Sequence, residues 1–230
     1  MIAKLTQANK IYESPAGRVT ALDKSDVELH EGELLLIIGP SGSGKTTLLS
    51  LLGCLINPTE GELEIDGKKT ANLSAKEMAT IRLNTIGFVF QQFNLLAPLT
   101  AEQNVGFPLQ MQGLSNAEIK RKTEEALQMV NMLEHKKKLP KQLSGGQQQR
   151  IAIARSLVTN PKIILCDEPT ASLDKDSLAI VMNELKELAK TGKSVAVVTH
   201  DPRLAKYADR AIEVKNGQVY PLENIQESIH

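Results

Sequence analysis

The sequence predicts an α/β fold in which a parallel β-sheet is covered by helices on both faces. The main support is a set of nearly continuous apolar runs: "LLLIIG" from Leu34, "KIILCDE" from Lys162 and "SVAVVTH" from Ser194. Strands of a parallel sheet are buried on both faces and are therefore apolar throughout. The segment "SLAIVMNELKELAK" lies between the last two runs and has helical spacing, as a crossover between parallel strands requires.

The first third of the chain and its C-terminal part favour strands joined by turns. "AKLTQANKIY" and "KSDVELHEGE" mix polar and apolar residues at nearly alternating spacing, which predicts short strands. Asp-Gly at 66–67 and Asn-Gly at 216–217 are typical hairpin turns. We therefore expect an N-terminal antiparallel β subdomain beside the parallel sheet.

From about residue 92 the pattern becomes helical. "SNAEIKRKTEEALQMVNML" has apolar residues at helical spacing, and Ser115 with Glu118 forms a capping box; Ser74 with Glu77 begins an earlier helix in the same way. We expect a single domain over 1–230. Its catalytic core, with the β subdomain, spans 1–91 and 159–222, and an α-helical subdomain spans 92–158.

Composition narrows the class of protein. The 230 residues include 27 basic and 27 acidic side chains, and this balance argues against a general nucleic-acid binder. No apolar run approaches the roughly 20 residues of a membrane span, and the N-terminus lacks the apolar core of a secretory signal. Cys54 and Cys166 lie among aliphatic residues, which predicts buried thiols. We therefore expect a cytoplasmic protein.

The segment "GPSGSGKTT", which begins at Gly39, matches the phosphate-binding pattern G-x-x-x-x-G-K-[ST] between a predicted strand and a predicted helix. Its glycines let backbone N–H groups turn toward phosphate oxygens, and the helix N-terminus adds its dipole. Lys45 supplies a full positive charge, and Thr46 places a hydroxyl where Mg²⁺ would lie. The predicted nucleotide ligands are Gly39, Ser41, Gly42, Ser43, Gly44, Lys45, Thr46 and Thr47.

Three polar residues end the other two apolar runs, at the sheet edge where ligands bind in parallel sheets. Asp167 is a candidate ligand for the Mg²⁺ of a nucleotide. Glu168 points in another direction and is a candidate general base, unless it is a solvated loop residue. His200 could bond the terminal phosphate or orient the water and Glu168, although a lone histidine is often structural. The remaining histidines have no such context and are expected at the surface: His30, His135 and His230.

A second glycine-rich loop, "LSGGQQQR" from Leu143, precedes a predicted helix but contains no lysine to hold a phosphate. The succession of "GPSGSGKTT", "FVFQQFNLL", "LSGGQQQR", "IILCDEPTASLD" and "VVTHD" resembles the ATP-binding subunits of ABC transporters, from about residue 2 to residue 222. "LSGGQ" is the signature of that family. The resemblance implies a P-loop NTPase with a RecA-like core, ATP and Mg²⁺ as ligands, and ATP hydrolysis coupled to transport or mechanical work.

The resemblance also explains the incomplete second loop. Subunits of this family pair head to tail, so that each signature covers the ATP held by the phosphate loop of the partner. It implies a homodimer with ATP at the interface and five residues that act in trans: Ser144, Gly145, Gly146, Gln147 and Asp174. The segment "ASLD" departs from the commoner Ser-Ala-Leu-Asp, but the aspartate is kept.

Other roles carry over by the same resemblance. Tyr12 resembles the aromatic residue that stacks on adenine, with a packing role as the alternative. Gln91 resembles the glutamine that reaches Mg²⁺, which completes a metal set of Thr46, Gln91 and Asp167. The implied catalytic residues are Lys45, Glu168 and His200.

The resemblance is greatest to the branch of lipoprotein-release, macrolide-efflux and cell-division ATPases. It implies a separately encoded membrane permease as partner and a peripheral position on the inner face of the cell membrane. An apolar set after Gln91 is either core of the helical subdomain or a docking groove for that partner: Phe93, Leu95, Leu96, Leu99 and Phe107. A soluble ABC ATPase acting on nucleic acid or ribosomes remains the alternative. A small P-loop kinase or GTPase would have no use for "LSGGQ".

Overall fold

The computed structural model describes residues 1–15, 17–170 and 175–222. The strands are β1 (Ala3–Ser14), β2 (Gly17–Leu29), β3 (Leu34–Ile38), β4 (Glu60–Ile65), β5 (Lys68–Lys69), β6 (Ile86–Val89), β7 (Ile163–Asp167), β8 (Ser194–Thr199), β9 (Arg210–Lys215) and β10 (Gln218–Leu222). The α-helices are α1 (Lys45–Leu52), α2 (Ala75–Thr85), α3 (Ala101–Met111), α4 (Asn116–Met129), α5 (Gly145–Leu157) and α6 (Lys175–Lys190). The 3-10 helices are η1 (Leu133–His135), η2 (Pro140–Gln142) and η3 (Pro202–Tyr207).

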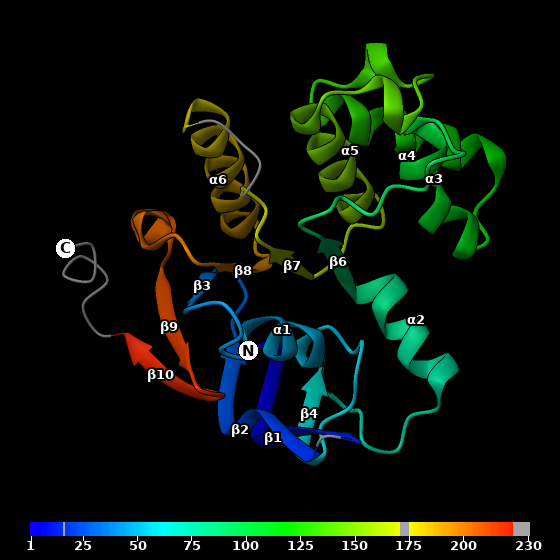
Figure 1. The fold of residues 1–230 in the computed structure, drawn as a ribbon. Coiled ribbons are helices and arrows are strands. Elements are labelled where there is room, and N and C mark those ends of the chain that lie inside the picture. The colour runs from blue at the N-terminus through cyan, green and yellow to red at the C-terminus, as the bar shows by residue number, and fades with distance from the viewer. Residues whose placement is uncertain (16, 171–174, 223–230) are drawn as a thin grey trace.

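The strands form two sheets (Figure 1). Within the described residues, one sheet has six strands in the order β10-β9-β3-β8-β7-β6, and all but β10 run parallel. The other has four antiparallel strands in the order β2-β1-β4-β5. The predicted parallel sheet and antiparallel β unit are therefore confirmed.

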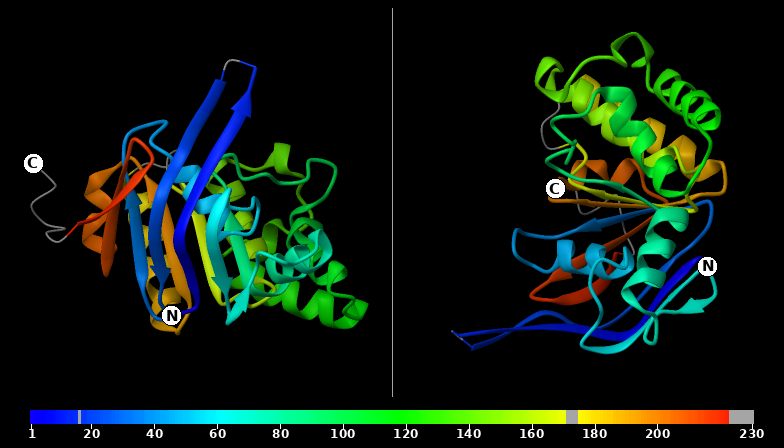
Figure 2. Two further views of the ribbon diagram at one scale, coloured as in Figure 1. Left: turned by 90° about the horizontal axis from the view of Figure 1, so that it is seen from below. Right: turned by 90° about the vertical axis from the view of Figure 1, so that its right-hand side faces the viewer.

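The central strands separate two hydrophobic cores, because successive side chains of a strand point to opposite faces. On β3, Leu34 and Leu36 join the core under α3, α4, α5 and α6, whereas Leu35 and Ile37 join the core shared with α1 and the antiparallel sheet. The same alternation holds along β7 and β8. Figure 2 shows the resulting layers, with α3, α4, α5 and α6 on one side of the six-stranded sheet and α1 and α2 with the antiparallel sheet on the other.

The first hairpin is longer than the short strands that the alternation predicted. Strands β1 and β2 have 12 and 13 residues, and their far end projects beyond the rest of the molecule (Figure 2). Leu5 and Leu22 are buried against the core, but the residues near the tip, including Tyr12 and its cross-strand neighbour Val19, are exposed. The projecting end is therefore held mainly by its own backbone ladder.

Local signals set the turns and the helix starts. Asp66–Gly67 and Asn216–Gly217 have φ between 50 and 77° and connect antiparallel strands, as Asp-Gly and Asn-Gly turns predict. The capping boxes predicted at Ser74 and Ser115 are present. Both cysteines are buried and free, as expected. Among the described residues, no helix is both long and apolar enough to cross a membrane.

Asn104 anchors the segment that follows β6. Its side chain is fully buried; its Oδ1 accepts from the Leu96 N–H at 2.7 Å, and its Nδ2 lies 3.0–3.1 Å from three carbonyl oxygens, those of Leu96, Leu99 and Thr100. The carbonyls of Leu96 and Thr100 also accept from the backbone N–H groups of Leu99 and Asn104, so the Leu96 N–H and the Leu99 carbonyl depend most on this side chain. Buried backbone groups left without partners are costly.

Replacing Asn104 with alanine should therefore lower the free energy of unfolding by about 2–4 kcal/mol, because the Leu96 N–H and the Leu99 carbonyl lose this partner. Urea denaturation measures the change, with Asn116→Ala as the control because Asn116 is exposed at the start of α4. Equal stability of the two variants would show that the loop does not depend on Asn104.

Candidate functional site

A pocket of about 450 Å³ opens at the carboxyl edge of the six-stranded sheet. The loop after β3, Gln91 after β6, and the ends of β7 and β8 form this pocket. They meet there because parallel strands present their carboxyl ends at one edge of the sheet. Its lining residues are Ser41, Gly42, Lys45, Thr46, Gln91, Asp167, Glu168, Val198 and His200. Residues predicted from three separate motifs therefore meet in one cavity.

The phosphate-binding loop requires glycine at two places. Gly39 and Gly44 have φ of 153 and 112°, and a Cβ at either position would lie 2.2–2.3 Å from a backbone carbonyl oxygen. The loop is also supported from outside: the Gly217 N–H donates to the Ser43 carbonyl at 2.9 Å, and the Asp23 N–H donates to the Gly217 carbonyl at 2.7 Å. The β9–β10 turn thus connects this loop to β2.

Lys45 is the first residue of α1 and is only 7% exposed. Its ammonium donates to the carbonyl oxygens of Gly39 and Pro40, both at 2.8 Å, so the side chain is folded back over its own loop. These acceptors keep the buried charge hydrogen-bonded. The lysine still lines the pocket.

Thr46 and Asp167 face each other across the pocket, with 3.5 Å between Thr46 Oγ1 and Asp167 Oδ2. Burial and then the neighbouring charge of Glu168 raise the pKa of Asp167. Among the described residues, no group of three or more His, Cys, Asp or Glu residues is placed to hold a metal. One carboxylate with one hydroxyl and the nearby Gln91 amide suits Mg²⁺, which keeps water and substrate phosphates among its ligands.

Glu168 turns away from Asp167, as predicted, because its backbone is left-handed with φ of 48°. Its N–H donates to the Val198 carbonyl at 2.9 Å, which ties it to β8. Its Oε1 lies 2.8 Å from His200 Nδ1, and its Oε2 accepts from the Thr199 hydroxyl at 3.4 Å. The carboxylate is 13% exposed, so it is mostly buried yet reaches the pocket.

Thr199 was not predicted as a site residue. It contacts Glu168, and its hydroxyl also accepts from the Asp201 N–H at 3.0 Å. The sequence did carry one signal for a role of Thr199 in the site, because this residue directly precedes His200 at the end of an apolar strand.

The other predicted residues do not line this pocket. Ser43 is buried beneath the loop with no partner for its hydroxyl, and Thr47 is half-buried on α1. Tyr12 lies on the projecting hairpin. Asp174 lies outside the described residues.

The signature residues begin α5 and also lie outside the pocket. Ser144 is the N-cap: its hydroxyl accepts from the Gln147 N–H at 3.3 Å, and its own N–H donates to Gln147 Oε1 at 2.9 Å. Gly145 is exposed, and a Cβ added there would meet no atom within 4 Å. His135, expected at the surface, is only partly exposed, and its Nε2 lies 3.2 Å from Gln147 Nε2. His230 lies outside the described residues.

Comparison with known sequences identifies the family. The model of the family described as "ABC transporter" matches residues 22–171. The ABC transporter ATP-binding protein MJ0796 of Methanocaldococcus jannaschii is 46% identical in an alignment that covers 97% of both chains. The macrolide export ATP-binding/permease protein MacB of Bartonella henselae is 43% identical over 219 residues, which cover 94% of this chain and 33% of MacB.

Solved structures agree with this match. The dimeric, post-hydrolysis structure of the ATP-binding cassette MJ0796 bound to ADP and Pi superposes with a TM-score of 0.90 at 43% identity, covering 96% of this chain and 99% of that one. CbiO1 of Clostridium perfringens, part of the ABC transporter complex cbiONQ, gives 0.86 at 32% identity, covering 99% and 90%. The predicted P-loop NTPase fold class is thereby confirmed. The chain belongs to the ABC transporter family and is one of its ATPase cassettes.

Proposed function

We propose that this cassette binds Mg-ATP, pairs with a second copy around it, and uses the hydrolysis to drive a separately encoded membrane permease. The observation that carries the proposal is the single pocket where the phosphate loop, Asp167, Glu168 and His200 meet. The purpose served is efflux, lipoprotein release or mechanical signalling across the envelope.

The nucleotide is held by the phosphate loop and α1. Backbone N–H groups of the loop, Ser43 included, and the N-terminus of α1 bind the phosphates, together with the side chains of Ser41 and Thr47. Lys45 moves from the carbonyl oxygens of Gly39 and Pro40 to the terminal phosphates. Tyr12 stacks on the adenine from the hairpin. Thr46, Gln91 and Asp167 would hold Mg²⁺, which would neutralise charge on the phosphates when bound.

Hydrolysis uses Glu168 as general base. The water oxygen attacks the γ-phosphorus as its proton passes to a Glu168 carboxylate oxygen, and the bond to the ADP oxygen breaks. His200 lies 2.8 Å from the same carboxylate and is 66% exposed, so it can hold Glu168 on one side and reach the phosphate on the other. Lys45 stabilises the charge that develops on the transferred group.

The signature completes the site of a second copy. Ser144, Gly145, Gly146 and Gln147 lie outside this chain's own pocket, and Gly145 leaves open space for another molecule. The N-terminus of α5 there offers N–H groups and a positive dipole end to a γ-phosphate. The resemblance to the family assigns Asp174 a role at the same interface, although this residue lies outside the described residues. The dimeric MJ0796 structure supports this pairing.

A groove of about 750 Å³ is the proposed docking site for the permease. We place it between the core of residues 1–91 and 159–222 and the helical subdomain of residues 92–158. The stacked rings of Phe88 and Phe90 form part of its lining, with Leu55, Phe107 and Met111 exposed along it. Of the apolar set after Gln91, only Phe107 lines the groove; Leu95 packs against the core.

An apolar groove of this size suits a short cytoplasmic helix of a membrane protein. Docking would hold the cassette peripherally at the inner face of the cell membrane. A nucleic-acid or ribosome partner is less well supported, because the formal net charge is zero. Two related proteins favour a membrane partner: MacB is named as an ATP-binding/permease protein, and CbiO1 is described as part of the ABC transporter complex cbiONQ.

The first test is Glu168→Gln, which removes the basic oxygen but keeps size and polarity. ATP should bind normally, hydrolysis should slow by about 10²-fold or more, and the ATP-bound dimer should accumulate. Phosphate release measures the hydrolysis rate, and sizing chromatography with ATP or ADP measures the dimer. Glu134→Gln is the control, because Glu134 is exposed. Turnover near the wild-type rate would remove Glu168 from this role.

The second test is Met111→Glu, which places a charge in the groove at a side chain that is 63% exposed. Folding and the ATPase rate of the isolated cassette should be kept, while co-purification with the permease should be lost. Met129→Glu is the matched control, because Met129 is equally exposed but lies outside the groove. If both variants bind the permease like the wild type, the docking site lies elsewhere.

A further inference from the structure

We propose that His135 is a positioning residue for the signature. The neutral imidazole of His135 holds the signature in place, and the protonated imidazole does not. The inference rests on the proposed role of the signature toward ATP on a second copy. Its basis is a chain of hydrogen bonds from the backbone of Ser144 through the side chain of Gln147 to the imidazole of His135.

The capping box decides how the Gln147 amide is oriented. The Ser144 backbone N–H can only donate, and it lies 2.9 Å from one end of the amide, so that end is the oxygen. The other end is then the NH₂ group, which points at His135 Nε2 from 3.2 Å. An NH₂ group can only donate, so His135 Nε2 must be the acceptor.

The protonation state of His135 follows from this geometry. An imidazole with an acceptor Nε2 is neutral and carries its proton on Nδ1. Protonation would bring the N–H of Nε2 to face the NH₂ of Gln147, so the bond would be lost. The amide is then free to leave Ser144, and the first turn of α5, which carries the paired glycines, loses one of its restraints.

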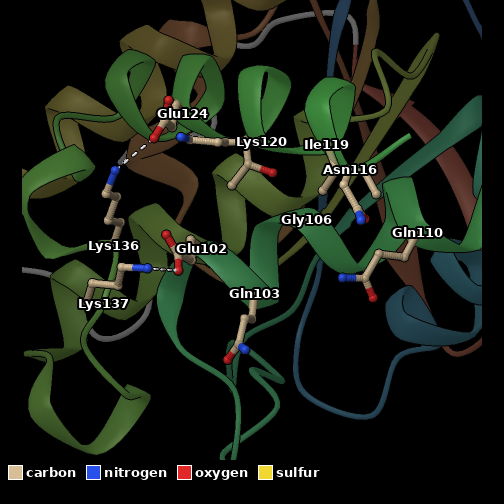
Figure 3. Close-up of a pocket in the computed structure, with 11 residues that line it drawn as sticks. Glu102, Gln103, Gly106, Gln110, Asn116, Ile119, Lys120, Glu124, Lys136 and Lys137 are labelled. Atoms are coloured by element: carbon tan, nitrogen blue, oxygen red, sulfur yellow. Dashed lines mark hydrogen bonds and ion pairs between the residues drawn. The ribbon is translucent and has the colours of Figure 1, made fainter. Parts of the chain in front are cut away.

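The loop that carries His135 is itself anchored, so the imidazole cannot simply follow the amide. Lys136 pairs with Glu124 of α4 at 2.8 Å, and Lys137 pairs with Glu102 of α3 at 2.7 Å (Figure 3). Both pairs border a cleft of about 450 Å³ between these helices and the loop. The Lys138 N–H also donates to the His135 carbonyl at 2.9 Å.

The surrounding charges nearly cancel. Besides these two ion pairs, the loop carries Glu134 and Lys138, while the first turn of α5 next to His135 contributes the uncharged side chains of Gln147 and Gln148. Among the side-chain types present here, only histidine ordinarily changes its charge between pH 5 and 8.

The direct test is the tautomer of His135 in the isolated protein without nucleotide, read from long-range ¹H–¹⁵N spectra at pH 8. His135→Gln assigns the signal by removing it. We expect a protonated Nδ1 and an unprotonated Nε2. A protonated Nε2 would overturn the proposal, whatever the protein does with ATP.

The functional test measures ATP-dependent dimerisation in the Glu168→Gln background from pH 8 to pH 5.5. His135→Ala should weaken dimerisation by about 3–10-fold at pH 8, the loss expected for one hydrogen bond, without changing ATP affinity of the monomer. ATP-dependent dimerisation of the Glu168→Gln parent should weaken as the pH falls. His135→Gln should dimerise like the parent at pH 8 and respond less to pH, because an amide oxygen accepts the same bond without titrating.

His30→Gln is the control, since His30 is an exposed partner of Glu28 far from α5 in the sequence and should keep the pH response of the parent. His200 is unchanged in every variant, so any effect that it has cancels in the comparison. If His135→Ala dimerises like the parent, or His135→Gln keeps the full pH response, the proposal is wrong. If no protein dimerises on ATP, the proposed function fails instead, and the tautomer still decides the bond.

Discussion

The register between β7 and β8 is the constraint on which the site depends. Asp167 pairs with Val198, and the Glu168 N–H continues the pairing to the Val198 carbonyl. This ladder places Glu168 beside Thr199 and His200, while β3, paired with β8 on its other side, delivers the phosphate loop to the same edge. A shift of one residue would reverse which side chains face the pocket and which face the two cores.

Glu168 shows how local strain serves the site. A left-handed glutamate is uncommon, and such conformations persist only where surrounding contacts hold them. Here the bond to β8 and the contacts with Thr199 and His200 supply that support. The result is that two adjacent carboxylates serve different partners: Asp167 faces Thr46, and Glu168 faces His200.

Much of the fold and site could be predicted from the sequence, because the signals are local. The phosphate loop lies between a strand and a helix, and Asp167, Glu168 and His200 each end an apolar run. The length of the β1–β2 hairpin was not predictable, because its exposed end has no core to give it a pattern. His135 was missed because its contact with Gln147 depends on the path of a loop that is held by ion pairs to α3 and α4. The hydrogen bonds from Lys45 to the carbonyls of Gly39 and Pro40 also could not be predicted, because they depend on the path of the loop.

Each ATP site should be built from two chains, and a mixture of two defective variants can show whether it is. Lys45→Ala damages the phosphate loop, and Gly145→Asp adds bulk and negative charge where the chain itself leaves open space. Each alone should be nearly inactive, whereas a mixture forms heterodimers in which one site has two intact halves. ATPase activity should therefore return in part, or differently tagged variants should pair on ATP if turnover requires two working sites. Neither activity nor ATP-dependent pairing in the mixture, under conditions where the wild type shows both, would contradict a site built from two chains.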